Sequence, residues 1–179
     1  MENANLLRIQ TVSRRFRIFF SVLIPSLPIF TLVFWLMFNY VPPGFKQGLP
    51  VATDHAFSIS TQLLAALVSM IPISVAVYGA NLLKKLFRLY ETGMIFCPEA
   101  ANHFKQLGHS LFYWVLANLI YTPLISVVLS LHNPPGERLI VAQFGSPDIA
   151  TLITGAIVLL ISWVMKEASS LEEEQAHTI

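Results

Sequence analysis

The stretch that decides the fold is residues 82–111, which read LLKKLFRLYETGMIFCPEAANHFKQLGHSL. It is a polar, positively charged segment in a chain of 179 residues that is 55% hydrophobic and only 12% charged. Because soluble domains carry about 25% charged residues, this composition indicates a membrane protein. The segment separates two long uncharged runs on its N-terminal side from two on its C-terminal side.

Each of these four runs is long enough to cross the hydrocarbon core of a bilayer, which is about 30 Å thick. The runs cover residues 18–38, 59–83, 111–131 and 149–165. A surface helix of a soluble protein needs a polar face, and these runs have none. We therefore predict an all-α fold, an integral membrane four-helix bundle that forms a single transmembrane domain over residues 1–179. The first run is too long for a cleaved signal peptide, so we expect it to remain as a span.

Lysine and arginine residues are distributed unevenly among the segments that flank these spans. Nine of the 11 lie in the N-terminal tail, in residues 82–111 and in the C-terminal tail, whereas loops 39–58 and 132–148 hold one each. Cytoplasmic segments of membrane proteins carry the excess of positive charge. We therefore expect both termini and the middle segment to be cytoplasmic.

The middle segment shows a helical pattern on both sides of Gly93. Apolar residues recur at helical spacing up to Tyr90, which extends the second span to Glu91. Gly93 then suits a C-terminal cap, while Cys97 and Pro98 suit the N-cap and first position of the next helix. We predict helices over 59–91 and 98–131, each about 50 Å long, so that both extend past the bilayer core.

The two helix extensions are expected to form a cytoplasmic hairpin with a short apolar tip. The tip either folds back between the helices or meets a partner. The basic face of the hairpin and the acidic C-terminal tail either pair with each other or bind a partner protein, and anionic lipid headgroups compete for the same cations. The candidate interaction surface consists of Lys84, Lys85, Arg88, Met94, Ile95, Phe96, Glu172, Glu173 and Glu174.

The second outer loop contains the run LIVAQF at residues 139–144, which is too short to span a membrane. We expect it to form a short strand or to lie on the membrane surface. The following Ser146, Pro147 and Asp148 suit the start of the fourth helix, with Ser146 as the N-cap.

Two blocks of this sequence carry a resemblance to a known family. The first follows the pattern F-R-L-Y-x-x-G-x-I-F and consists of Phe87, Arg88, Leu89, Tyr90, Gly93, Ile95 and Phe96. The second, at the C-terminus, consists of Leu171, Glu173, Glu174, Thr178 and Ile179. On these residues the chain resembles the bacterial domain-of-unknown-function 2975 family. The resemblance implies a four-span protein of the bacterial cell (inner) membrane without an assigned activity. Genes of small helix-turn-helix regulators often lie beside those of the family, which suggests such a regulator as a cytoplasmic partner.

No predicted span contains Asp, Glu, Lys, Arg or His in its interior. Such residues mark proton and ion pathways, so their absence argues against a coupled transporter. Gln62 and Asn118 are candidates for polar contacts within the membrane, and interhelical hydrogen bonding is the simplest role for both. The sequence shows no catalytic motif and no metal-ligand spacing, so we expect no enzyme activity, no metal and no cofactor.

The leading functional hypothesis is a non-enzymatic multi-pass protein that signals or regulates through its cytoplasmic hairpin and acidic tail. The alternative is a protein that binds or conducts a small molecule or lipid through a cavity between proline-kinked helices. Both hypotheses place the protein in the lipid bilayer and predict no direct binding of nucleic acid. The residues leave the oligomeric state open.

Overall fold

The computed structural model describes residues 2–42, 44, 56–95, 97–131, 133 and 138–176, with the backbone alone at 2–6 and 171–176. These residues form four long α-helices, one short 3₁₀ helix and no β-strand. The elements are α1 (Glu2–Leu36), η1 (Phe38–Tyr40), α2 (Ile59–Glu91), α3 (Pro98–Ser130) and α4 (Ser146–Ala176). Each α-helix contains a stretch long and apolar enough to cross a membrane. The predicted all-helical class with four apolar helices is therefore confirmed.

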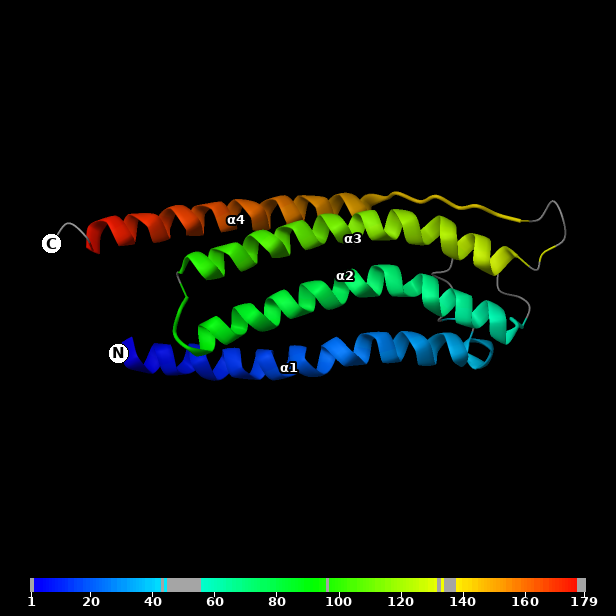
Figure 1. Ribbon diagram of the computed structural model, residues 1–179, viewed down its shortest axis with the longest axis horizontal. Coiled ribbons are helices and arrows are strands. Elements are labelled where there is room, and N and C mark those ends of the chain that lie inside the picture. The colour runs from blue at the N-terminus through cyan, green and yellow to red at the C-terminus, as the bar shows by residue number, and fades with distance from the viewer. Residues whose placement is uncertain are drawn as a thin grey trace.

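The four helices lie side by side in chain order, and each runs antiparallel to the one before it (Figure 1). α2 packs against α1 and α3, and α3 packs against α2 and α4. Among the described residues, α1 and α4 make no substantial contact with each other. The helices thus form an open row with α1 and α4 at its edges. Both chain ends and the α2–α3 connection lie at the same end of this row (Figure 1).

Helix α2 ends at Glu91, as the sequence predicts. Gly93 adopts a positive φ of 85°, which an L side chain rarely tolerates. The N–H of Gly93 donates to the carbonyl of Tyr90, and the N–H of Met94 donates to the carbonyl of Leu89. This pair of bonds is a Schellman motif, which satisfies carbonyl groups in the last turn of the helix. The role of Gly93 as a helix cap is confirmed.

The start of α3 also matches the prediction. Cys97 occupies the N-cap position, and its Sγ accepts a hydrogen bond from the N–H of Ala100 at 3.4 Å. Pro98 follows as the first helical residue, where its missing N–H leaves no intrahelical bond unmade. The α2–α3 connection therefore contains only a few residues outside the two helices.

Helices α3 and α4 approach each other most closely at two glycines. A Cβ placed on Gly108 would lie 3.2 Å from the carbonyl oxygen of Gly155 and 2.7 Å from the side chain of Leu159. The end of the row that holds the α2–α3 connection and both chain ends is called the basic end below. Closer to this end, the hydroxyl of Ser162 donates to the carbonyl of Ala101 at 2.8 Å. These contacts set the register, in which Gly155 lies level with Gly108 and Ser162 lies level with Ala101.

The segment that precedes α4 is extended and lies along α3 (Figure 1). The N–H of Leu139 donates to the hydroxyl of Ser130 at 3.3 Å, and that of Val141 donates to the hydroxyl of Ser126 at 3.0 Å. The spacings agree, because four helical residues rise about 6.0 Å and two extended residues rise about 6.6 Å. The described residues of this segment form no strand, since two serines of α3 bind this backbone instead of another strand. The alternative of a segment on the surface stays a prediction.

Helix α4 begins one residue earlier than the sequence indicates. The carbonyl of Gly145 accepts from the N–H groups of Asp148 and Ile149, so Gly145 is the N-cap instead of Ser146. The Oδ2 atom of Asp148 accepts in return from the N–H of Gly145 at 2.9 Å. This is one half of a capping box, in which the side chain of the third helical residue bonds back to the N-cap; Gly145 has no side chain to supply the other half.

The glycine contact between α3 and α4 gives a matched test of the register. Gly108→Ala should destabilise the protein relative to Gly79→Ala by about 1–3 kcal/mol, the usual cost of overpacking. Both changes gain the same helix propensity, but a Cβ on Gly79 meets only Ser110 Oγ at 3.5 Å. Thermal unfolding of both variants in detergent, followed by circular dichroism, measures the difference. Equal stabilities would contradict the close approach of the two helices.

Candidate ligand-binding site

The predicted interaction surface at the basic end is partly exposed. Lys85 and Arg88 are exposed on α2, whereas Lys84 is half-buried. In the connection, Met94 is exposed and Ile95 is half-buried. The cations therefore point outward, while the tip is only partly covered by the helices.

The remaining residues of that surface are less fully described. Phe96 lies outside the described residues, and Glu172, Glu173 and Glu174 lie in α4 where the backbone alone is described. α3 lies between α2 and α4 (Figure 1). Pairing between the basic face and the acidic tail thus stays a prediction.

The ion pair that the structure does show joins α1 to the end of α2. Nε of Arg17 lies 2.6 Å from Oε2 of Glu91, and Nη2 donates to Oε1 at 3.3 Å. Beside this pair, the rings of Phe16 and Phe20 stack on Phe87 with centroid distances of 5.0 and 5.8 Å. Because the ion pair is partly exposed, most of the attraction between the helices here comes from the stacked rings.

The two polar residues predicted to act within the membrane lie in different parts of the fold. Gln62 is buried in the first turn of α2. Asn118 lies near the middle of α3, where its Nδ2 donates to the carbonyl of Trp114 at 2.9 Å. The bond of Asn118 lies within its own helix and leaves its Oδ1 available as an acceptor.

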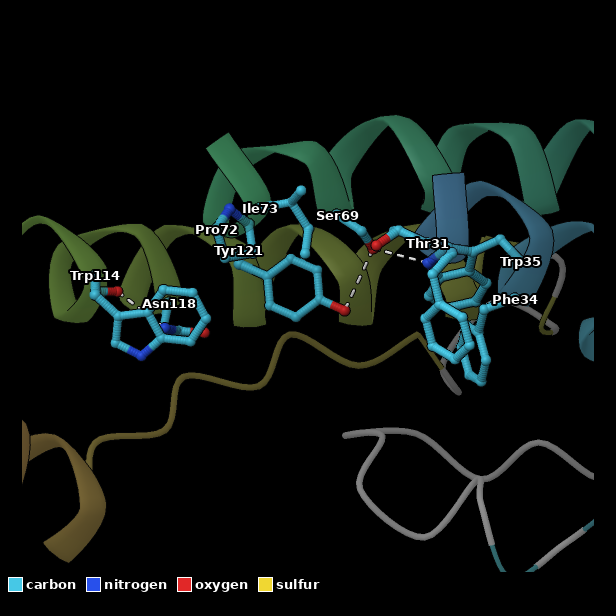
Figure 2. Close-up of a pocket in the computed structure, with 10 residues that line it drawn as sticks. Thr31, Phe34, Trp35, Ser69, Pro72, Ile73, Trp114, Asn118 and Tyr121 are labelled. Atoms are coloured by element: carbon cyan, nitrogen blue, oxygen red, sulfur yellow. Dashed lines mark hydrogen bonds between the residues drawn. The ribbon is translucent and has the colours of Figure 1, made fainter. Parts of the chain in front are cut away.

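Asn118 lines the largest of three neighbouring pockets, with a volume of about 370 Å³. Side chains of α1, α2 and α3 form this first pocket, which opens on one face of the helix row (Figure 2). Its lining is mainly aromatic and aliphatic, with a few polar groups. The lining residues are Phe30, Thr31, Phe34, Trp35, Ser69, Pro72, Ile73, Trp114, Asn118 and Tyr121. Ligand sites typically combine this kind of lining with a volume of about 300–1,000 Å³.

A hydrogen-bond network centred on Ser69 fixes one side of the first pocket. Nε1 of Trp35 donates to the Ser69 hydroxyl at 2.8 Å, and that hydroxyl donates to the carbonyl of Ala65 at 2.8 Å. The hydroxyl of Tyr121 lies 3.5 Å from Ser69 Oγ (Figure 2). Because the single proton of Ser69 is used by Ala65, the Tyr121 hydroxyl keeps its own proton for Ser69 or for a bound molecule.

A second pocket of about 300 Å³ adjoins the first along Trp114 and Asn118. It lies between α3, the end of the extended segment and the first turns of α4. Its lining is about half polar, much more so than that of the first pocket, and consists of Trp114, Asn118, Thr122, Gln143, Gly145, Pro147, Asp148 and Thr151. A third pocket of about 280 Å³, mainly apolar, continues from Trp114 toward the basic end between α1, α2 and α3.

Asp148 is the residue of this site that the sequence does not reveal. It precedes the fourth predicted span, which places it in an outer loop. In the structure it lines a pocket with Asn118 and Thr122, which belong to the interior of the third predicted span. Residues 110–131 of α3 contain no ionisable side chain other than tyrosine. An acidic group at this level of a membrane protein is a candidate functional residue.

The register of α4 explains why Asp148 lies so far along α3. Seven residues separate Asp148 from Gly155, which is level with Gly108. They rise about 10 Å along the helix and bring Asp148 level with the middle of α3. The extended segment spans the remaining length of α3 up to Ser130. Ser126 and Ser130, four residues apart and facing alternate residues of LIVAQF, are the sequence signal for this arrangement.

In the described part of the chain, no group of three His, Cys, Asp or Glu side chains lies close enough together to hold a metal ion. The first and second pockets together form one open groove beside Trp114 and Asn118. The fold and this groove define a four-helix membrane protein with a hollow between its helices. A family model described as "Protein of unknown function (DUF2975)" matches residues 24–179, and the chain belongs to this family. Searches of curated proteins and of solved structures find no match.

Proposed function

We propose that this protein is a non-enzymatic, multi-pass protein of the bacterial inner membrane that binds a small amphipathic molecule in the groove. The observation that carries the proposal is the pair of adjoining pockets that share Trp114 and Asn118, one mainly apolar and one whose lining is about half polar. A molecule with an apolar body and a polar head matches both linings. The mainly apolar lining of the first pocket favours binding over permeation.

Proline residues support the groove. Pro72 lies inside α2 and lines the first pocket. A proline within a helix removes one backbone hydrogen bond and bends the helix, which opens space beside it. α2 and α3 both change direction along their length (Figure 1), and Pro123 lies within α3. The proposed ligand therefore occupies space that these bends create.

A signalling role through the basic end is a second candidate function. Lys85, Arg88 and Met94 are exposed at the end of the row that also holds both chain ends. We place this end in the cytoplasm. Because the register sets the fourth predicted span, residues 149–165, beside residues 98–114 of α3, the proposed hairpin projects less far past the bilayer than the helix lengths alone suggest. A small helix-turn-helix regulator is the proposed partner, and ligand binding in the groove is the proposed input.

A neutral, fluorescent apolar probe, N-phenyl-1-naphthylamine, tests the groove. Trp35 and Trp114 line the first pocket, so a bound probe should quench their emission saturably by energy transfer. The measurement uses Trp163→Phe protein in nanodiscs, because Trp163 is exposed on α4 away from the pocket. Thr31→Phe fills the pocket and should weaken binding at least about tenfold, or 1.4 kcal/mol.

Thr154→Phe is the matched control for that experiment. Thr31 and Thr154 each donate a hydrogen bond to the carbonyl four residues earlier, but Thr154 is exposed on α4. The control should bind the probe like the parent protein. Non-saturable quenching, or equal effects of the two changes, would contradict a ligand site in the groove.

The native Cys97 tests the orientation. It is half-buried at the start of α3, and the protein has no other cysteine. A maleimide that cannot cross membranes should label it only after the cells are permeabilised, because the proposed hairpin is cytoplasmic. Labelling in intact cells would show that the orientation is inverted.

A further inference from the structure

The polar pocket beside Asp148 offers several hydrogen-bond acceptors, together with the side-chain amide of Gln143. The hydroxyl protons of Thr122 and Thr151 are donated to the carbonyls of Asn118 and Pro147, at 2.9 and 2.8 Å. Both hydroxyl oxygens therefore face their surroundings as acceptors only. The amide of Asn118 uses one N–H on its own helix, which leaves Oδ1 as an acceptor and the second N–H as a donor.

Asp148 adds a negative charge to these acceptors. Its Oδ2 accepts from the N–H of Gly145, while Oδ1 makes no hydrogen bond within the described part of the chain. No lysine, arginine or histidine of the described residues forms an ion pair with it. Arg138 is ten residues from Asp148 in the sequence, and the seven extended residues up to Gly145 alone span about 23 Å. A half-buried carboxylate without an ion-pair partner favours a cationic ligand.

Trp114 contributes the other element of a cation site. It lines both the polar pocket with Asp148 and the apolar pocket with Tyr121 and Phe34. The face of an indole ring attracts ammonium groups. An anionic head would meet the charge of Asp148, and the N–H of Gly145 at the start of α4 is already used.

We propose that the groove binds a small organic cation, with its ammonium head beside Asp148, Asn118 and Trp114 and its apolar body in the adjoining pocket. The inference rests on the proposed function and names the chemical class of the ligand. The charge is recognised by a carboxylate that also caps α4. Occupancy of the head site therefore acts directly on the first turn of α4 and on the segment that docks on α3.

The test is displacement of N-phenyl-1-naphthylamine from the protein in phosphatidylcholine nanodiscs. The competitors are decylammonium, 1-decanol and decyl sulfate, which share one chain and differ in charge. Decylammonium should displace the probe at a concentration at least about tenfold below that of the other two. Asp148→Asn should remove this preference, because a neutral amide does not attract the ammonium charge, while the amide oxygen still accepts from the N–H of Gly145.

Glu167→Gln is the matched control, because it removes one exposed carboxylate of α4 away from the pocket. It should keep the preference for decylammonium, as should the conservative change Asp148→Glu. If the Asp148→Asn protein no longer binds the neutral probe, the test uses Thr151→Lys instead. The ammonium group of that lysine would pair with Asp148 and occupy the place of the ligand's charge. Thr151→Lys should then abolish the preference.

The outcomes separate the two proposals. Binding of the neutral probe with equal displacement by all three competitors would overturn the cation site and leave the groove intact. A preference for decylammonium that survives both Asp148→Asn and Thr151→Lys would also overturn it. Failure of the neutral probe to bind the parent protein would overturn the proposed function itself.

Discussion

The hydroxyl groups of Ser126 and Ser130 on α3 hold the backbone of the segment that leads into α4, and the position of α4 depends on them. Backbone N–H groups at membrane depth need partners, because lipid offers none. A helix normally supplies these partners within one segment. Here the extended segment obtains some of these partners from side chains of α3. The segment therefore covers the C-terminal half of α3 as extended chain, and α4 begins level with the middle of α3.

The groove follows from this arrangement and from the open row of helices. α1 and α4 lie at opposite edges, so one face of α2 and α3 is left uncovered beside Trp114 and Asn118. The late start of α4 brings the carboxylate of Asp148 to that face. Pro72 of α2 lines the same region. The carboxylate of Asp148, the ring of Trp114 and the apolar first pocket thus lie together. No single helix supplies all three.

Much of the fold is predictable from the sequence, because helix periodicity and capping are local. The end of α2 at Glu91 and the beginning of α3 at Pro98 follow from Gly93, Cys97 and the apolar spacing. The site is not predictable in the same way. Hydropathy assumes that each uncharged run starts at the membrane boundary, which assigns Asp148 to an outer loop. Hydrogen bonds from the extended segment to Ser126 and Ser130 set the position of Asp148 along α3. The hydropathy of a single run does not predict hydrogen bonds between two segments.

The depth of Ile149 in a bilayer tests this account most directly. Ile149 is exposed at the start of α4, next to Asp148, and a spin label there, in Cys97→Ser protein, reports its depth by oxygen and nickel-chelate accessibility. Labels at Leu116 and Leu131, both exposed on or just after α3, provide the mid-depth and outer references. The account predicts that the label at position 149 matches that at 116. A depth equal to that of position 131 would contradict it.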